Sequence, residues 1–167
     1  QNACSSPHII VWYKTKKENI EFFWKKFGEI VKTKYHLDLG NVYLKFSNEV
    51  LNLTKIDNFN SSNKDKNFIT RIKVSELQKN IHEIRGKFGT FIEYDSQNFN
   101  FLKKIVNRKF QTLSYEGIDS KMIVNFLKKK NINGVDRIVK LGNALQMSLI
   151  WDGFDIPRSL SRIIENE

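Results

Sequence analysis

Cysteine and histidine are scarce in this chain. Cys4 is the single cysteine among 167 residues, and the histidines are His8, His36 and His82. One cysteine cannot form a disulfide within the chain, and such sparse use is typical of proteins from a reducing, cytoplasmic setting. A zinc site needs several cysteine or histidine ligands, so we expect no bound metal.

Long apolar runs and glycine-rich loops are absent as well. No stretch approaches the roughly 18 apolar residues that a membrane-spanning helix needs, and residues 1–8 lack the basic and apolar parts of a signal peptide. The eight glycines are scattered, and none lies in a phosphate-binding loop or a dinucleotide fingerprint. We therefore expect no membrane span. We also expect any nucleotide cofactor to be bound mainly by residues outside this chain.

Basic residues outnumber acidic ones by 28 to 18, which gives a net charge of +10. Such an excess raises nucleic acid, or another anionic ligand, as a partner. The lysine clusters do not alternate with aromatic residues as in known single-strand or RNA-binding motifs. We favour solvent-exposed helix surface and expect no nucleic-acid partner. A basic α/β binding module for nucleic acid or an anionic ligand remains the alternative of a different class.

The hydrophobic pattern predicts strands that alternate with helices. We expect strands at residues 8–13, 68–74, 87–94, 110–115 and 136–141. Helices are expected at residues 17–35 and 42–53, after a cap at Ser96, and after a cap at Ser120; residues 156–165 form a short helix or strand. Residues 58–67 are polar and rich in turn formers, which predicts a surface loop. This order indicates an α/β fold with a partly parallel sheet flanked by helices, in one domain over residues 1–167.

The helix expected at residues 17–35 has the clearest period. Its apolar residues fall three to four positions apart, which predicts that one face packs on a core. The residues of this face are Ile20, Phe23, Trp24, Phe27, Ile30 and Val31.

Cys4 is the candidate nucleophile, although a lone cysteine near a terminus is more often an inert small apolar residue. Its neighbours Ala3, Ser5 and Ser6 are small, so no bulky side chain next to it in sequence shields the sulfur. Pro7 then precedes a predicted buried strand. We expect the thiol on a loop at a sheet edge, where ligands commonly bind in α/β proteins. Backbone N–H groups there can lower the pKa of a thiol from roughly 8.5 and stabilise an oxyanion.

Four ordered blocks resemble one protein family. They are Gln-Asn-Ala-Cys-Ser-Ser-Pro at 1–7, Phe-Gln-Thr-Leu-Ser-Tyr-Glu-Gly-Ile-Asp at 110–119, Gly-Val-Asp-Arg-Ile-Val at 134–139 with Gly-Asn-Ala-Leu at 142–145, and Trp-Asp-Gly-Phe-Asp at 151–155 with Ser-Leu-Ser-Arg at 159–162. Together they resemble the long-chain acyl-CoA reductases of bacterial luminescence, which belong to the aldehyde dehydrogenase superfamily.

The resemblance implies an aldehyde-dehydrogenase-like catalytic domain that reduces a long-chain acyl thioester to a fatty aldehyde with NADPH. Cys4 is then the catalytic nucleophile, which forms an acyl-enzyme, and coenzyme A is the leaving group. The chain begins with Gln1 rather than Met, and we expect it to be the C-terminal portion of a longer reductase whose cofactor-binding domain precedes it. The implied partners are fatty acyl-CoA or an acyl-protein thioester, acyl-protein synthetase and acyl transferase subunits, and further copies in a homo-oligomer. Another thioester-forming relative of aldehyde dehydrogenase is the nearer alternative.

Further site candidates follow from the resemblance and from chemistry. Residues 85–89, Arg-Gly-Lys-Phe-Gly, resemble the superfamily's Glu-x-Phe-Gly segment, whose Glu holds the nicotinamide ribose, but Gly86 stands in the place of that Glu. Trp151 and Phe154 are candidates for an acyl tunnel, with ordinary core packing as the favoured interpretation. Arg137 is a candidate for a phosphate of coenzyme A or NADPH, or else for an ion pair with a neighbouring carboxylate. His8 and His36 can transfer protons, and neither is singled out as the base.

Overall fold

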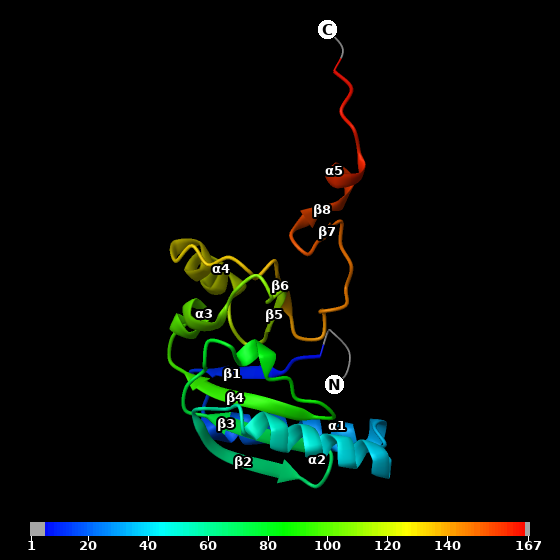
Figure 1. Cartoon of the computed structure of the whole chain (residues 1–167). Coiled ribbons are helices and arrows are strands. Elements are labelled where there is room, and N and C mark those ends of the chain that lie inside the picture. The colour runs from blue at the N-terminus through cyan, green and yellow to red at the C-terminus, as the bar shows by residue number, and fades with distance from the viewer. Residues whose placement is uncertain (1–5, 166–167) are drawn as a thin grey trace. The chain divides into compact units, whose positions relative to one another are not determined.

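The computed structural model describes residues 6–165 and divides the chain into two compact units (Figure 1). The first unit covers Gln1–Ile105 and the second Val106–Glu167. The first unit has one four-stranded sheet, and the second has two separate two-stranded sheets.

The first unit is built on a four-stranded mixed sheet. Its strands, in spatial order, are β1 (Ile9–Tyr13), β4 (Thr90–Ser96), β3 (Ile69–Val74) and β2 (Phe59–Asp65). β4 pairs in parallel with both β1 and β3, and β2 pairs antiparallel with β3. The α/β class and the partly parallel sheet are thus confirmed.

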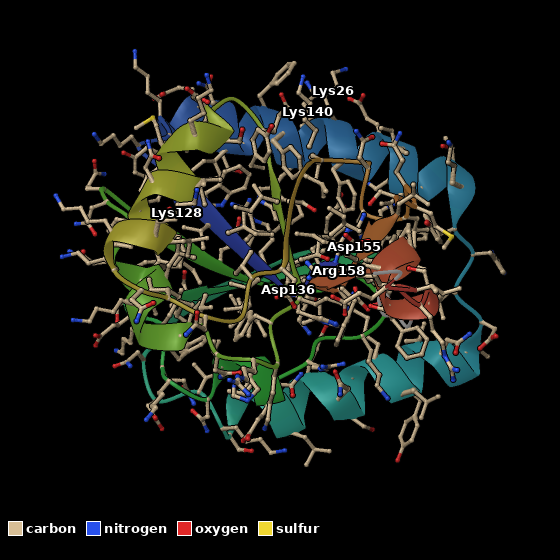
Figure 2. The ribbon with its side chains drawn as sticks, turned by 90° about the horizontal axis from the view of Figure 1, so that it is seen from above. Lys26, Lys128, Asp136, Lys140, Asp155 and Arg158 are labelled. Carbon is tan, nitrogen blue, oxygen red and sulfur yellow. The ribbon has the colours of Figure 1, made fainter. Side chains whose placement is uncertain are left out.

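Two long helices cover opposite faces of this sheet, as Figures 1 and 2 show. Helix α1 (Lys17–Lys34) packs Ile20, Trp24 and Val31 against Ile69 and Phe91 of the sheet. The predicted helical face is therefore correct with one exception. Ile30 lies at the edge of that face and is 51% exposed.

Helix α2 (Leu39–Leu53) packs on the other face with its polar side inward. Lys45, Glu49 and Asn52 are buried, and each finds a hydrogen-bond partner: the Asn67 carbonyl for Lys45, the Thr90 hydroxyl for Glu49, and the Arg85 carbonyl for Asn52. Six of its large apolar side chains are exposed instead. They are Leu39, Tyr43, Leu44, Phe46, Val50 and Leu51.

The predicted surface loop at 58–67 is wrong, because this segment forms β2. Its backbone pairs with β3 at the edge of the sheet, from Phe59 opposite Val74 to Asp65 opposite Ile69. Nearly every side chain of β2 is exposed, so neither face of the strand needs apolar residues. A strand without a buried face has no alternating apolar pattern, and propensity alone then favours a loop.

The connection from β3 to β4 and the end of the unit also differ from expectation. β4 begins at Thr90 rather than 87, because Phe88 and Gly89 have positive φ angles that a strand does not tolerate. Ser96 ends β4 and does not cap the next helix, α3 (Asn100–Ile105). The side chain of Asn98 accepts the hydrogen bond from the Asn100 N–H instead.

The second unit contains short elements. Its members are β5 (Thr112–Tyr115), α4 (Ser120–Lys129), β6 (Arg137–Lys140), β7 (Ile150–Trp151), β8 (Phe154–Asp155) and α5 (Ile156–Leu160). β5 and β6 pair in parallel, and β7 and β8 form an antiparallel hairpin. Asp119, one residue before the predicted Ser120, is the N-cap of α4, because its carboxylate accepts from the Lys121 N–H.

None of the helices within residues 6–165 is long and apolar enough to cross a membrane, as expected from the sequence.

Candidate functional site

Cys4, the predicted nucleophile, lies outside the described residues. The described chain enters β1 from Ser6, Pro7 and His8, that is, at the amino end of the strand. The carboxyl ends of the parallel strands β1, β3 and β4 lie at the opposite edge of the sheet. The rule that places ligands at the carboxyl ends of an open α/β sheet therefore does not apply to the segment that leads into β1.

His8 is the described residue nearest to Cys4 in sequence with acid-base chemistry. It is half-buried, and its ring nitrogen Nδ1 lies 3.1 Å from the carbonyl oxygen of Gly86. A carbonyl can only accept, so Nδ1 carries the proton and the neutral ring keeps its lone pair on Nε2. Burial and the positive charge of Arg85 hold the pKa of His8 below its usual value of 6.5, and the Gly86 hydrogen bond only partly opposes them. His8 is therefore a neutral imidazole at pH 7, able to accept a proton at Nε2.

The contact between His8 and Gly86 joins two parts of the sequence that are 78 residues apart. One part adjoins the block at residues 1–7, and the other is the Arg-Gly-Lys-Phe-Gly segment at 85–89. These two segments are separate candidates in the sequence, and no local pattern in either indicates that they meet. The meeting depends on the pairing of β1 with β4, because the loop before β4 lies beside the start of β1.

Gly86 has a steric reason to lack a side chain. It is buried, and a Cβ atom built on it would lie 2.1 Å from the carbonyl oxygen of Thr90. No residue with a side chain fits there without a shift of the backbone. A glutamate at position 86 would therefore meet the Thr90 carbonyl. The acidic residue three positions before Gly86 is Glu83, which lies on the short helix η1 (Ile81–Glu83) and is exposed.

A buried carboxylate that the sequence analysis missed lies on the α1 face of the sheet. Glu93 is 2% exposed and accepts hydrogen bonds from the indole N–H groups of Trp12 and Trp24 and from the Nε–H of Arg71. The guanidinium of Arg71 also donates twice to Glu21 at 3.0 Å, and it stacks over the Trp24 ring. Both carboxylate oxygens of Glu93 are occupied by groups of the protein itself. The cluster therefore joins α1, through Trp24, to the sheet.

A second buried polar cluster lies under α2. Lys45 donates to the Asn67 carbonyl at 3.0 Å, and its ammonium lies 3.8 Å from a Glu49 oxygen whose carboxylate also pairs with Lys64. Burial, aided by the charge of Lys64, lowers the pKa of Lys45 to about 8, although Glu49 opposes the shift. Burial raises the pKa of Glu49, but hydrogen bonds and the two lysine charges outweigh it and hold this pKa below its usual value.

A shallow groove of about 420 Å³ lies at the carboxyl ends of β3 and β4. The ion pair between Lys104 and Glu76 lies in its wall, together with Tyr94, Ser96 and Phe101. This is the edge at which open α/β sheets usually bind ligands. Of the candidate site residues that the structure describes, none lines this groove.

In the second unit, Arg137 contacts backbone carbonyls and an aromatic ring. Its guanidinium donates to the carbonyls of Ala144 and Gln146 at 2.9 and 2.8 Å and packs 4.0 Å over the ring of Trp151. The predicted alternative, an ion pair with a carboxylate, is therefore wrong. Trp151 is half-buried in this contact, whereas Phe154 is 67% exposed and does not belong to a core.

The remaining candidates are on the surface. Figure 2 shows Lys128 at the end of α4 and Lys26 on the outer side of α1, and both side chains are exposed. Lys26 pairs with Glu29 one turn further along the helix. His36, in the turn between α1 and α2, is exposed. These positions agree with the expectation that much of the positive charge is solvated helix surface.

The described residues show no metal site, and comparison with known proteins finds no relative. Among residues 6–165, no group of three or more His, Cys, Asp or Glu side chains is arranged to hold a metal ion. The chain matches no protein-family model, no curated protein and no solved structure.

Proposed function

We propose that this chain is the cysteine-bearing catalytic portion of a long-chain acyl thioester reductase with an aldehyde-dehydrogenase-like fold. The four ordered sequence blocks support this assignment. The observation that carries it is the protonation state of His8, which lies four residues from Cys4 in the sequence. Its imidazole is neutral, because Nδ1–H donates to the Gly86 carbonyl and Nε2 keeps its lone pair.

In this proposal, Cys4 takes the acyl group from a fatty acyl-CoA. His8 accepts the thiol proton at Nε2, and the thiolate attacks the carbonyl carbon to form a new C–S bond. The bond between that carbon and the CoA sulfur then breaks, and the imidazolium returns the proton to the departing thiolate. The products are an acyl-Cys4 thioester and free coenzyme A.

The reduction of this thioester is not assigned to residues of this chain. NADPH supplies a hydride when it is bound, but the described residues do not fit a nicotinamide site of the resembled type. A Glu at position 86 is sterically excluded by Thr90, and the chain has no dinucleotide fingerprint. The proposal therefore limits this chain to acyl transfer onto Cys4 and leaves hydride transfer to a cofactor-binding domain.

Acyl labelling tests the proposal directly. The chain is incubated with a radiolabelled long-chain acyl-CoA, and we expect a covalent label that hydroxylamine releases, together with one equivalent of free coenzyme A. Cys4→Ser should lose this hydroxylamine-sensitive label. Ser5→Ala, which changes an adjacent small residue and leaves the thiol intact, is the matched control and should keep it.

His8 is tested by the rate of labelling. His8→Gln keeps a group that can bind the Gly86 carbonyl but has no titratable nitrogen, so we expect labelling at least about tenfold slower at pH 7. Labelling of Cys4→Ser equal to that of the unaltered chain would place the nucleophile elsewhere. Absence of label from the unaltered chain, with salt-sensitive binding to nucleic acid, would favour the basic binding module.

A further inference from the structure

One buried amide links α2 to the loop that binds His8. Asn52 lies in the last turn of α2 and is 6% exposed, and its Nδ2 group donates to the carbonyl of Arg85 at 3.0 Å. The next carbonyl along the chain is that of Gly86, which accepts from the ring of His8 at 3.1 Å. Two consecutive backbone carbonyls therefore connect the amide of Asn52 to the imidazole of His8.

The direction of the Gly86 carbonyl fixes the tautomer of His8. Within residues 6–165, this carbonyl is the hydrogen-bond partner of the His8 ring. A neutral imidazole has one protonated nitrogen, and the hydrogen bond at one nitrogen sets which of the two it is. If the carbonyl turned away from Nδ1, the proton could move to Nε2, and the lone pair that accepts a proton would no longer lie there.

The Gly86 residue does not hold that direction by itself. Glycine has no Cβ atom, and its backbone is therefore freer to rotate than that of any other residue. Contacts on both sides of Gly86 restrict this rotation. Asn52 holds the Arg85 carbonyl before it, and the Thr90 N–H donates to the Lys87 carbonyl at 3.2 Å after it.

The amide of Asn52 is itself held in one orientation. Its Nδ2 group also donates to the Oδ1 atom of Asn48, one turn earlier in α2, at 3.1 Å. An amide NH₂ group has two protons, and these two acceptors use both. The donor end of the side chain therefore faces the Arg85 carbonyl.

We propose that Asn52 is a positioning residue for His8. Its amide holds the peptide between Arg85 and Gly86 so that the Gly86 carbonyl faces Nδ1 of His8, which keeps the lone pair on Nε2. The consequence for acyl transfer rests on the proposed function, whereas the effect on the tautomer of His8 does not.

The tautomer is measured by NMR of the histidine ring nitrogens, because a protonated and an unprotonated nitrogen differ clearly in chemical shift. His8→Gln identifies the His8 signals. We expect the unaltered chain to carry the proton on Nδ1. Asn52→Leu has a side chain of similar size without a donor, and it should give a mixture of the two tautomers. Its rate of acyl labelling should fall about fivefold, less than for His8→Gln, because the imidazole is still present.

Gln78 provides the matched control. Its buried amide donates to the Lys55 carbonyl at 3.0 Å, which is the same kind of contact in a different loop. Gln78→Met should lower the free energy of unfolding at least as much as Asn52→Leu, because Gln78 also bonds to Asp57 and Asn80. It should leave the tautomer of His8 and the labelling rate unchanged.

Asn48→Ala is the milder variant and serves if Asn52→Leu does not fold. It removes the oxygen that orients the Asn52 amide, and it should shift the tautomers in the same direction by a smaller amount. A folded variant at either position with the tautomer of the unaltered chain would overturn the proposal. Gln78→Met with the same mixture as Asn52→Leu would overturn it too, since lost stability would then explain the effect.

The labelling results separate this proposal from the proposed function. A mixture of tautomers in Asn52→Leu with an unchanged labelling rate would overturn the role of Asn52 in acyl transfer. An unaltered chain that takes no acyl label contradicts the proposed function instead, and the NMR comparison still decides whether Asn52 positions His8.

Discussion

Replacement of the Glu93 carboxylate should lower the free energy of unfolding of the first unit by a large amount. One of its oxygens accepts from both Trp12 and Trp24, and the other accepts from Arg71 at 2.9 Å. Glu93→Gln can keep the amide oxygen toward the two indoles. Its NH₂ group then faces the Arg71 Nε–H, so that one charge-assisted hydrogen bond is replaced by two opposed donors.

The size of the effect follows from what each substitution leaves unpaired. A hydrogen bond to a charged group contributes about 1.5–3 kcal/mol, so Glu93→Gln should lower the free energy of unfolding by about 2–3 kcal/mol. Glu93→Leu removes every acceptor and leaves the guanidinium without its buried partner, for which we expect about 4–6 kcal/mol. That is a large part of the roughly 5–15 kcal/mol of a typical protein.

Glu21 provides the matched control, because it pairs with the same guanidinium but from the surface. Its side chain is 53% exposed, so Glu21→Gln should cost less than about 1 kcal/mol. Urea unfolding followed by tryptophan fluorescence measures all three variants, since Trp12 and Trp24 contact Glu93 directly. A Trp151→Phe background removes the tryptophan of the second unit from the signal. Equal losses for Glu93→Gln and Glu21→Gln would refute the reasoning.

Two further perturbations test the buried cluster under α2 and the loop before β4. Lys45 has a pKa of about 8 in the folded chain and near 10.5 in the unfolded chain. Between these pH values the unfolded chain binds more protons than the folded chain. The free energy of unfolding should therefore rise by about 3 kcal/mol as the pH goes from 8 to above 10.5. Lys45→Met should remove this component in urea titrations across that range, and an unchanged pH slope would contradict the assignment. Gly86→Ala should lower the free energy of unfolding by more than about 2 kcal/mol, because its Cβ would meet the Thr90 carbonyl at 2.1 Å. An equally stable Gly86→Ala protein would show that the loop has room for a side chain. Gly40→Ala is the milder comparison, since Gly40 is exposed and its Cβ would lie 3.3 Å from the Asp38 side chain rather than against a backbone carbonyl.

Several features could be predicted because they depend on local sequence alone. The three-to-four spacing of Ile20, Trp24 and Val31 is enough to define α1 and its buried face, because a helix on a core repeats its burial every turn. The short β-branched run at 9–13 similarly defines β1. The hairpin of β7 and β8 was missed although its signal is present: Asp152 and Gly153 both have positive φ, as an Asp-Gly type I′ turn requires.

The candidate site also has parts that the sequence indicates and parts that depend on the tertiary structure. The sequence singles out Cys4 as a candidate, and it offers His8 and His36 as proton-transfer groups without choosing between them. The hydrogen bond from His8 to Gly86, and the clash that forbids a side chain at Gly86, cannot. Both depend on which strands pair, and a residue's sequence neighbours do not encode a partner that lies 78 positions away.

What the sequence alone determined is the α/β class and the long helices, since each follows from a period or a composition within a short window. Tertiary structure decided which face of α2 is buried and whether residues 59–65 form a strand. Lys45 and Glu49 face inward because the sheet beneath supplies hydrogen-bond partners for them, and no property of the helix by itself favours that orientation. β2 exists because β3 offers a free edge, and backbone hydrogen bonds to that edge need no particular side chains.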